Sequence, residues 1–161
     1  MMDIVIDASP LILLSKIGLL HLLNKLFDAV YIPHAVIQEI QAINKTEMKI
    51  NITEISFIPF EISNKIAVRG LLGRLHMGES EVMIGAIEKG ITTVVLDESA
   101  ARNKAKQLGL EVTGTLGILL KAQKHGLIED VGQEIIKLKK AGMYLSDEIT
   151  QRVLNTKKQE S

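Results

Sequence analysis

The sequence predicts an α/β fold: a three-layer α/β/α sandwich around a central, mainly parallel sheet of four to five strands, with C-terminal helices packed on it. Two observations lead to this prediction. Short, uninterrupted β-branched runs such as 4–6 and 92–96 are typical of strands buried on both faces of a parallel sheet. Longer segments with apolar residues at helical spacing lie between such runs, in the alternating order that builds parallel sheets.

The first part of the chain alternates strand-like and helix-like segments. Ser9-Pro10 predicts a helix start, because serine can cap free backbone amides and proline is tolerated at the first helical position. Gly18 is expected to end or bend that helix. The expected elements are a strand over 4–6, helical segments over 11–26, a strand over 29–32 closed by Pro33, and a helix over about 34–43.

Residues 44–77 carry the weakest pattern of the chain. They contain one plausible strand around 56–60 and a glycine-punctuated segment, Gly70-Leu71-Leu72-Gly73. Because no clear period runs through them, we expect an irregular or mobile insert here.

The second part of the chain has sharper signals. A helix over 79–89 is expected to end at Gly90 and one over 100–108 at Gly109, because glycine is favoured just beyond helix ends. Apolar, β-branched runs predict strands over 92–96 and 111–113. The remaining chain has a helical pattern over about 115–124, 130–140 and 146–154.

The composition is typical of one globular domain. With 161 residues, 47% of them hydrophobic and 24% charged, we expect a single domain over 1–155 and a frayed polar tail over 156–161. The lack of cysteine excludes disulfides, thiolate zinc sites and a cysteine nucleophile. No apolar stretch approaches the roughly 18 residues that span a bilayer, and the first residues lack the basic start of a secretory signal. We therefore expect no membrane contact and a cytoplasmic location.

Charge is balanced overall but unevenly distributed. Nineteen basic and nineteen acidic residues cancel, which excludes a polycationic nucleic-acid binder. Residues 1–100 carry 8 basic and 12 acidic side chains, a net −4, and residues 101–161 carry 11 basic and 7 acidic, a net +4. Any nucleic-acid contact must therefore come from a local patch.

Two aspartates stand where predicted strands end. Open parallel sheets bind ligands beyond the carboxyl ends of their strands, so Asp7 and Asp97 are the first candidates for a site. If their strands are neighbours, about 4.8 Å apart, the carboxylates repel each other, and a divalent cation is the simplest means of keeping both ionised. Glu39, Glu79 and Glu81 can complete an oxygen-only pocket, which suits Mg²⁺ or Mn²⁺ better than zinc or copper.

Each acid also has a purely structural explanation. Asp7 can cap the helix that begins near Ser9, and Glu79 or Glu98 in a first helical turn interacts favourably with the helix dipole whether or not it binds a ligand. In combination, two strand-end aspartates and two helical glutamates match metal-assisted phosphodiester hydrolysis. In that reaction cations activate water and hold the attacking and leaving oxygens.

Four short segments follow one another in a fixed order: Ile4-Val5-Ile6-Asp7-Ala8-Ser9-Pro10-Leu11, Val36-Ile37-Gln38-Glu39-Ile40, Gly78-Glu79-Ser80-Glu81, and Val95-Leu96-Asp97-Glu98 followed by Arg102. In order and spacing they resemble the PIN-domain superfamily of metal-dependent ribonucleases. The later segments 112–117 and 141–146 resemble a largely uncharacterised prokaryotic branch of PIN-like, nucleic-acid-binding proteins. The resemblance covers nearly the whole chain.

The resemblance implies roles for individual acids. Asp7 matches the first-strand metal ligand of the family, Glu39 the glutamate on the following helix, and Asp97 the aspartate that ends the fourth strand. Toxin-type members carry an aspartate at the start of the helix before that strand, where this chain has Glu79, with Glu81 as the competing choice. Glu98 matches a further acid that many members carry, although its register differs.

The resemblance also implies partners. Toxin-type members act in pairs with an antitoxin that occludes or fills the acidic site, and dimers are common in the family. On this ground we expect RNA as substrate, an antitoxin protein encoded nearby and a homodimer.

Basic side chains near the acids are candidates for phosphate contact. Arg102 and Lys104 lie on the helix after Asp97, but an exposed cationic face with an Arg102–Glu98 ion pair is an equally valid explanation. Ser9 is a further candidate, although a capping role explains it more simply. With only 3 phenylalanines, 2 tyrosines and no tryptophan, base stacking contributes little, which favours structured RNA read by shape.

Three functions remain compatible with these residues. The leading hypothesis is a divalent-metal-dependent endoribonuclease in which Asp7, Glu39, Glu79 and Asp97 hold the cation. Glutamate in place of aspartate at position 79, together with the modest basic surface, motivates a PIN-like module that binds RNA or protein without cleaving. A metal-dependent phosphatase acting on small phosphomonoesters requires the same acids.

Overall fold

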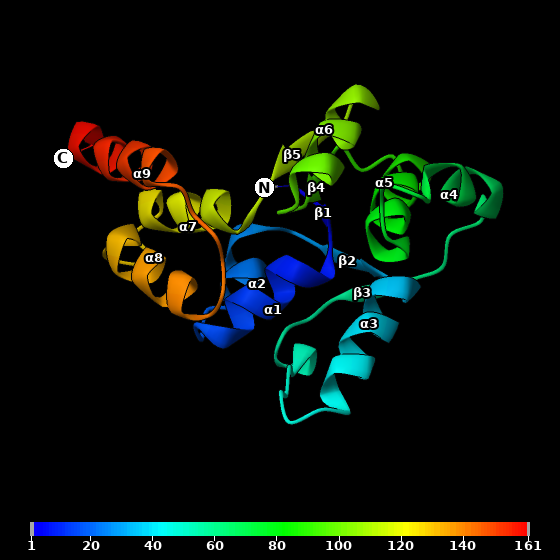
Figure 1. Ribbon diagram of the computed structural model, residues 1–161, viewed down its shortest axis with the longest axis horizontal. Helices are drawn as coiled ribbons and strands as arrows, with labels where there is room; N and C mark the ends of the chain where they lie inside the picture. Colours follow the sequence, from blue (N-terminus) through cyan, green and yellow to red (C-terminus); the bar gives the residue numbers. More distant parts are fainter. Residues whose placement is uncertain (1, 161) are drawn as a thin grey trace.

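The computed structural model describes residues 2–160, with side chains described through residue 155. Its centre is an all-parallel sheet of five strands in the order β3-β2-β1-β4-β5 (Figure 1). The predicted α/β/α sandwich is confirmed. The strands are β1 (Ile4–Ile6), β2 (Val30–Pro33), β3 (Ile58–Phe60), β4 (Thr93–Val95) and β5 (Glu111–Thr113).

Helices connect the strands and extend beyond the last of them. The helices before β4 are α1 (Ala8–Lys16), α2 (Leu22–Leu26), α3 (His34–Asn44), the short 3₁₀ helix η1 (Ile52–Glu54), α4 (Lys65–Leu71) and α5 (Met77–Lys89). Those after β4 are α6 (Ser99–Gln107), α7 (Thr115–Lys124), α8 (Val131–Lys140) and α9 (Asp147–Glu160).

The helices form a layer on each side of the sheet. Figure 1 shows α1, α2 and α7 on one side and α4, α5 and α6 on the other, with α8 and α9 stacked outside α7. Helix α3 packs against both α1 and α5, so it joins the two layers at one edge of the sheet. No helix in the described part of the chain combines the length and the hydrophobicity that crossing a membrane requires.

The central strands form the middle of the hydrophobic core. All three residues of β1 and of β4 are buried, which explains why these strands are β-branched and, apart from Thr93, apolar without alternation. Each fully buried isoleucine or valine of this kind contributes about 1.5–3 kcal/mol. The edge strands β3 and β5 are partly exposed and show weaker sequence patterns.

The strand order reverses direction between β1 and β4. From β1 the chain moves to β2 and β3 on one side, then crosses to β4 and β5 on the other. The two strands are in register, with Ile6 opposite Val95. Such a reversal leaves a crevice at the carboxyl ends of the two strands, which is where parallel sheets bind ligands. Asp7 and Asp97 follow these two ends.

Two local predictions are wrong. Ser9 does not cap α1: the N-cap residue is Asp7, and Ser9 is exposed in the first turn. The segment 44–77 is not an irregular insert, since it contains η1, β3 and α4. Helix α4 is capped locally by Asn64, whose Oδ1 accepts the N–H of Ala67 (3.0 Å), and is also held by tertiary contacts that sequence periodicity does not reveal. The carboxylate of Glu88 on α5 accepts hydrogen bonds from the backbone N–H groups of Ser63 (3.0 Å) and Asn64 (2.5 Å), just before the helix begins.

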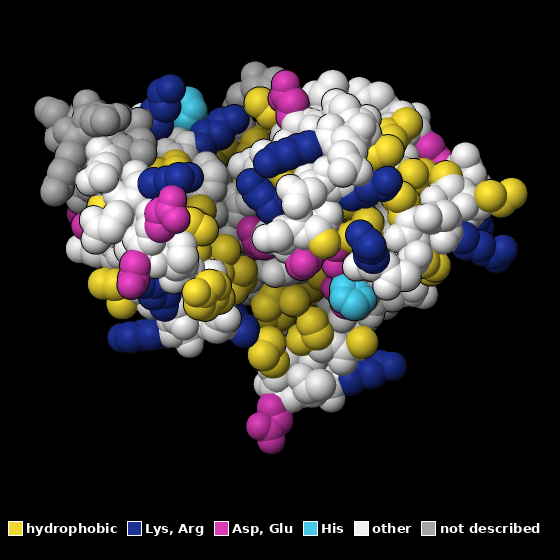
Figure 2. Space-filling view, turned by 45° about the horizontal axis from the view of Figure 1, so that its top comes forward, with side chains coloured by type: hydrophobic (Ala, Val, Ile, Leu, Met, Phe, Trp, Pro, Cys, Tyr) yellow, Lys and Arg dark blue, Asp and Glu magenta, His cyan; other side chains and the backbone are white. Residues whose placement is uncertain are grey.

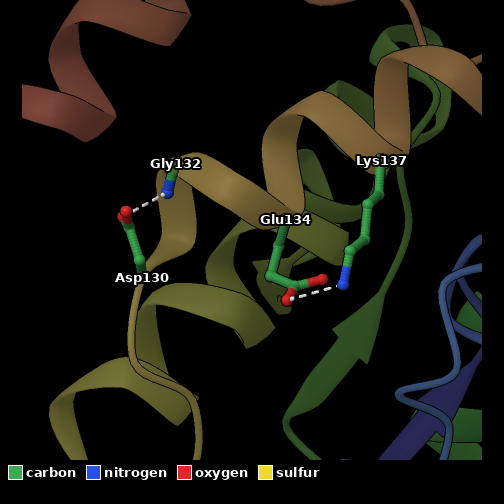
Figure 3. Close-up of polar contacts among 4 residues, drawn as sticks. All are labelled: Asp130, Gly132, Glu134 and Lys137. Atoms are coloured by element: carbon green, nitrogen blue, oxygen red, sulfur yellow. Dashed lines mark hydrogen bonds and ion pairs between the residues drawn. The ribbon is translucent and has the colours of Figure 1, made fainter.

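The C-terminal helices are attached through α7. The backbone N–H of Val131 donates to Oε1 of Gln123 on α7 (2.9 Å), and Oδ1 of Asp130 accepts from the N–H of Gly132 at the start of α8 (2.8 Å). Further along α8, Glu134 is largely buried and pairs with Lys137 at 3.4 Å (Figure 3). The expected frayed tail, 156–161, has its side chains and residue 161 outside the described part, so it stays a prediction.

Candidate active site at the strand ends

Asp7 is a buried carboxylate at the centre of the strand-end crevice. Its backbone N–H donates to the carbonyl of Val95 (3.1 Å), which ties it to the end of the neighbouring strand. Its side chain makes no capping hydrogen bond to α1 and is only 7% exposed. Burial is the main cause that raises the pKa of Asp7, and the nearby carboxylates of Glu39, Glu79 and Asp97 add to it. Against the lowering effect of the Ala8 amide, the resulting pKa is about 7.

Gly78 allows the first turn of α5 to approach these acids closely. A Cβ atom at this position would lie 3.3 Å from Oδ1 of Asp7 and 3.9 Å from Oε1 of Glu39. It would also lie 3.4 Å from Cγ2 of Val36. The absence of a side chain at Gly78 therefore brings the carboxylates from β1 and α3 next to α5.

Glu79 is the second buried acid of the crevice. Its side chain is 6% exposed, and its Oε2 is buried without a hydrogen-bond partner in the described part of the chain. Burial raises the pKa of Glu79, and the carboxylates of Glu98 and Glu39 add to this, while His76 opposes it. A buried carboxylate with one unpaired oxygen is costly unless a ligand or cation satisfies it.

Glu81, the competing choice for the acid on α5, has a different partner. Its Oε1 accepts the backbone N–H of Ala35 (3.0 Å), in the first turn of α3. That amide has no partner within its own helix, so Glu81 provides the capping that Pro33 at the N-cap does not. Glu79 differs in that its Oε2 is buried without a hydrogen-bond partner in the described part of the chain, and the carboxylates of Glu98 and Glu39 help to raise its pKa.

Asp97 is fixed in place by the start of α7. Its Oδ1 accepts the backbone N–H of Thr115 (2.8 Å), and its Oδ2 accepts the Thr115 hydroxyl (2.6 Å). Gly114 leaves room for this, because a Cβ there would lie 2.7 Å from both Oδ1 of Asp97 and Nη1 of Arg102. Sequence reasoning assigned no role to Thr115 at the acids. Its position two residues beyond the strand 111–113, after Gly114, was the available signal.

The remaining candidates surround the acids. Glu98 is exposed and caps α6, with Oε2 accepting the N–H of Ala101 (3.0 Å). Arg102 donates from Nη1 to the carbonyl of Leu96 (2.8 Å). This contact holds the guanidinium beside Asp97, in place of the ion pair with Glu98 that was the alternative explanation. Lys104 lies further along α6, and Ser9 faces solvent on α1.

The donor chemistry of the crevice fits a hard divalent cation. The acids supply oxygen donors, the pKa values of Asp7 and Glu79 are raised, and Oε2 of Glu79 lacks a partner in the described part of the chain. Within residues 2–155, however, no three histidine, aspartate or glutamate side chains stand close enough to form a ready metal-binding group. A cation would therefore have to draw the carboxylates together.

The fold and the site define an α/β domain with acidic side chains at the reversal point of a five-stranded parallel sheet. The family model described as PIN domain matches residues 3–159, nearly the whole chain. The chain therefore belongs to the PIN-domain family, whose members are generally nucleases and typically use divalent metals. A search of curated proteins found no significant match.

Proposed function

We propose that the protein is a divalent-metal-dependent endoribonuclease that hydrolyses RNA phosphodiesters and acts as the toxin of a toxin–antitoxin pair. One arrangement carries the proposal: the buried carboxylate of Asp7 lies at the reversal point of the sheet, close to Gly78 on α5 and to Glu39 on α3. Burial and acidic neighbours raise its pKa to about 7. Membership of the PIN-domain family supports hydrolytic nuclease chemistry.

Asp7, Glu39 and Glu79 are the residues that would hold Mg²⁺ or Mn²⁺, with Asp97 beside them. A bound cation of this kind neutralises carboxylates, polarises a phosphodiester and lowers the pKa of water. Asp7 stays protonated up to about pH 7 while its acidic neighbours are uncompensated, so its ionisation is coupled to cation binding. Oε2 of Glu79 is a free acceptor within the same crevice.

Asp97 and Arg102 have positions that do not depend on a ligand. Both oxygens of Asp97 are held by Thr115, so the carboxylate keeps one orientation. Arg102 uses one donor on the Leu96 carbonyl, and its other guanidinium N–H groups remain for a phosphate oxygen. We assign Arg102 to holding the scissile phosphate, with Ser9, exposed beside Asp7, as a second candidate for phosphate contact.

The proposed partners follow from the family resemblance and from charge. Uncompensated carboxylates at the strand ends attract a cationic group, and an antitoxin that inserts a basic side chain there would occlude the site. We include such an antitoxin and a homodimer in the proposal.

The test is RNA cleavage measured during a Mg²⁺ titration. Wild-type protein is expected to cleave only with added Mg²⁺ or Mn²⁺ and to stop when EDTA is added. Asp7→Asn is expected to lose this cleavage, whereas Asp3→Asn, a matched change at an exposed aspartate, is expected to retain it. Equal metal-dependent cleavage by Asp7→Asn would refute the proposal. An aryl phosphate in a parallel reaction identifies the phosphatase alternative, since hydrolysis of this compound but not of RNA would support it.

Two observations favour a non-catalytic module. Within residues 2–155 the acids do not form a ready three-ligand metal group, and the sequence has glutamate at position 79, where toxin-type members carry aspartate. If the protein binds RNA or a protein partner without cleaving RNA at any metal concentration, this second function holds.

A further inference from the structure

A groove of about 480 Å³ lies between the segment 70–75 and helix α6. Its polar lining consists of Arg74 from the turn before α5 and of Asn103, Lys104 and Gln107 from α6. The rest of the lining is aliphatic side chains and backbone. Lys104 was a candidate for substrate contact on sequence grounds, whereas Arg74 was not.

The charge of this groove has one sign. Its lining includes two cationic side chains and no carboxylate. A second groove, of about 250 Å³, lies on the other side of α4 and carries Lys65 and Arg69 together with Glu61 and Glu81. The second groove therefore balances its own charge, while the first presents uncompensated positive charge. Within residues 2–155, neither Arg74 nor Lys104 has a side-chain hydrogen bond or ion pair.

The groove begins next to the crevice acids. Its α6 wall starts immediately after Asp97 and Glu98, and its other wall ends at Leu75, just before His76 and the first turn of α5, which carries Glu79. Residues of both segments line the same groove, so the two walls face each other. Figure 2 shows acidic side chains near the middle of one face, with Lys and Arg side chains above them in the view.

We propose that this groove holds the RNA backbone on one side of the scissile phosphodiester, with Arg74 and Lys104 contacting phosphates and Asn103 and Gln107 contacting sugar or phosphate oxygens. The proposal rests on the endoribonuclease function proposed above. No aromatic side chain lines the groove, so bases cannot stack there and the contact is independent of sequence. Sequence preference, where present, must arise elsewhere.

The test is the salt dependence of RNA binding. Binding of a labelled single-stranded RNA is measured by fluorescence anisotropy, and all variants are made in the Asp7→Asn background to prevent cleavage. Arg74→Gln and Lys104→Gln are each expected to weaken binding about fivefold at 0.1 M salt. Each should also lower the slope of log K against log salt by about 0.7, the value for one lost phosphate contact on a single strand. The loss should be the same for RNAs of different sequence, and Arg74→Lys should restore the slope.

Two control variants match the charge that is removed. Arg69→Gln changes an arginine in the charge-balanced groove, and Lys106→Gln changes an exposed lysine of α6 outside the groove lining. Both are expected to keep the wild-type slope. If Arg74→Gln and Lys104→Gln behave like these controls, or if no RNA binds, the groove proposal is overturned. If binding depends on both residues but wild-type protein never cleaves RNA, the groove stands and the endoribonuclease proposal fails.

Discussion

Replacing Asp7 by asparagine is expected to stabilise the cation-free protein at and above neutral pH, although the same change abolishes the proposed activity. The substitution keeps the shape of the side chain and removes its charge. In the folded state that charge is unfavourable, because the carboxylate is buried and lies near Glu39, Glu79 and Asp97. In the unfolded chain it is solvated and costs nothing.

The size of the effect follows from the pKa. Raising the pKa of an aspartate from 3.8 to about 7 costs its ionised form about 4 kcal/mol. Between these two pH values the folded state binds the proton more tightly than the unfolded state does. The free energy of unfolding therefore falls as the pH rises from about 4 to 7 and then levels off. Asp7→Asn removes this fall, so the variant gains up to about 4 kcal/mol over wild type above pH 7, or a rise in Tm of roughly 10 °C.

The assay is thermal or urea unfolding in EDTA at several pH values from 4 to 8, with Asp3→Asn as the control. Wild type and Asp7→Asn should have similar stability at pH 4 and diverge as the pH rises, whereas Asp3→Asn should follow wild type at every pH. Mg²⁺ is expected to stabilise wild type more than Asp7→Asn, because the cation compensates the charge that the variant lacks. A difference that does not change with pH, or a variant that is less stable at pH 8, would refute the reasoning.

Two further variants probe the assignments within the crevice. Glu81→Gln is expected to retain cleavage, because the amide oxygen can still accept the N–H of Ala35, whereas Glu79→Gln is expected to lose the Mg²⁺ response. Equal effects of the two variants on the initial rate of cleavage would contradict this assignment. Thr115→Val removes the hydroxyl that holds Oδ2 of Asp97. We expect the cleavage rate to fall by about 10–100-fold and the free energy of unfolding by about 1.5–3 kcal/mol. Unchanged cleavage rates and melting curves would contradict this role of Thr115.

The fold was predictable because its central strands are buried on both faces. Burial on both faces favours short, uninterrupted runs of β-branched residues, and such runs are recognisable in the sequence. Helix α4 has a local signal that the prediction overlooked, since Asn64 caps it by accepting the N–H of Ala67. The hydrogen bonds to the two amides before the helix come from Glu88, more than twenty residues further along the chain, and these no local pattern reveals. Ser9 was misassigned because the helix begins at Ala8, two residues earlier than the Ser-Pro signal indicates, with Asp7 as its N-cap residue.

The sequence alone determined that Asp7 and Asp97 would follow the ends of buried parallel strands, since burial pattern and strand direction are encoded locally. Only the tertiary structure decided what each candidate site residue contacts. Glu81 reaches an amide of α3, Asp97 is held by Thr115, and Arg102 binds the Leu96 carbonyl. These partners are distant in the chain or depend on side-chain direction, and neither property leaves a periodic trace in the sequence. The raised pKa of Asp7 likewise arises from burial and from the proximity of several elements, which exist only once the sheet and both helical layers have assembled.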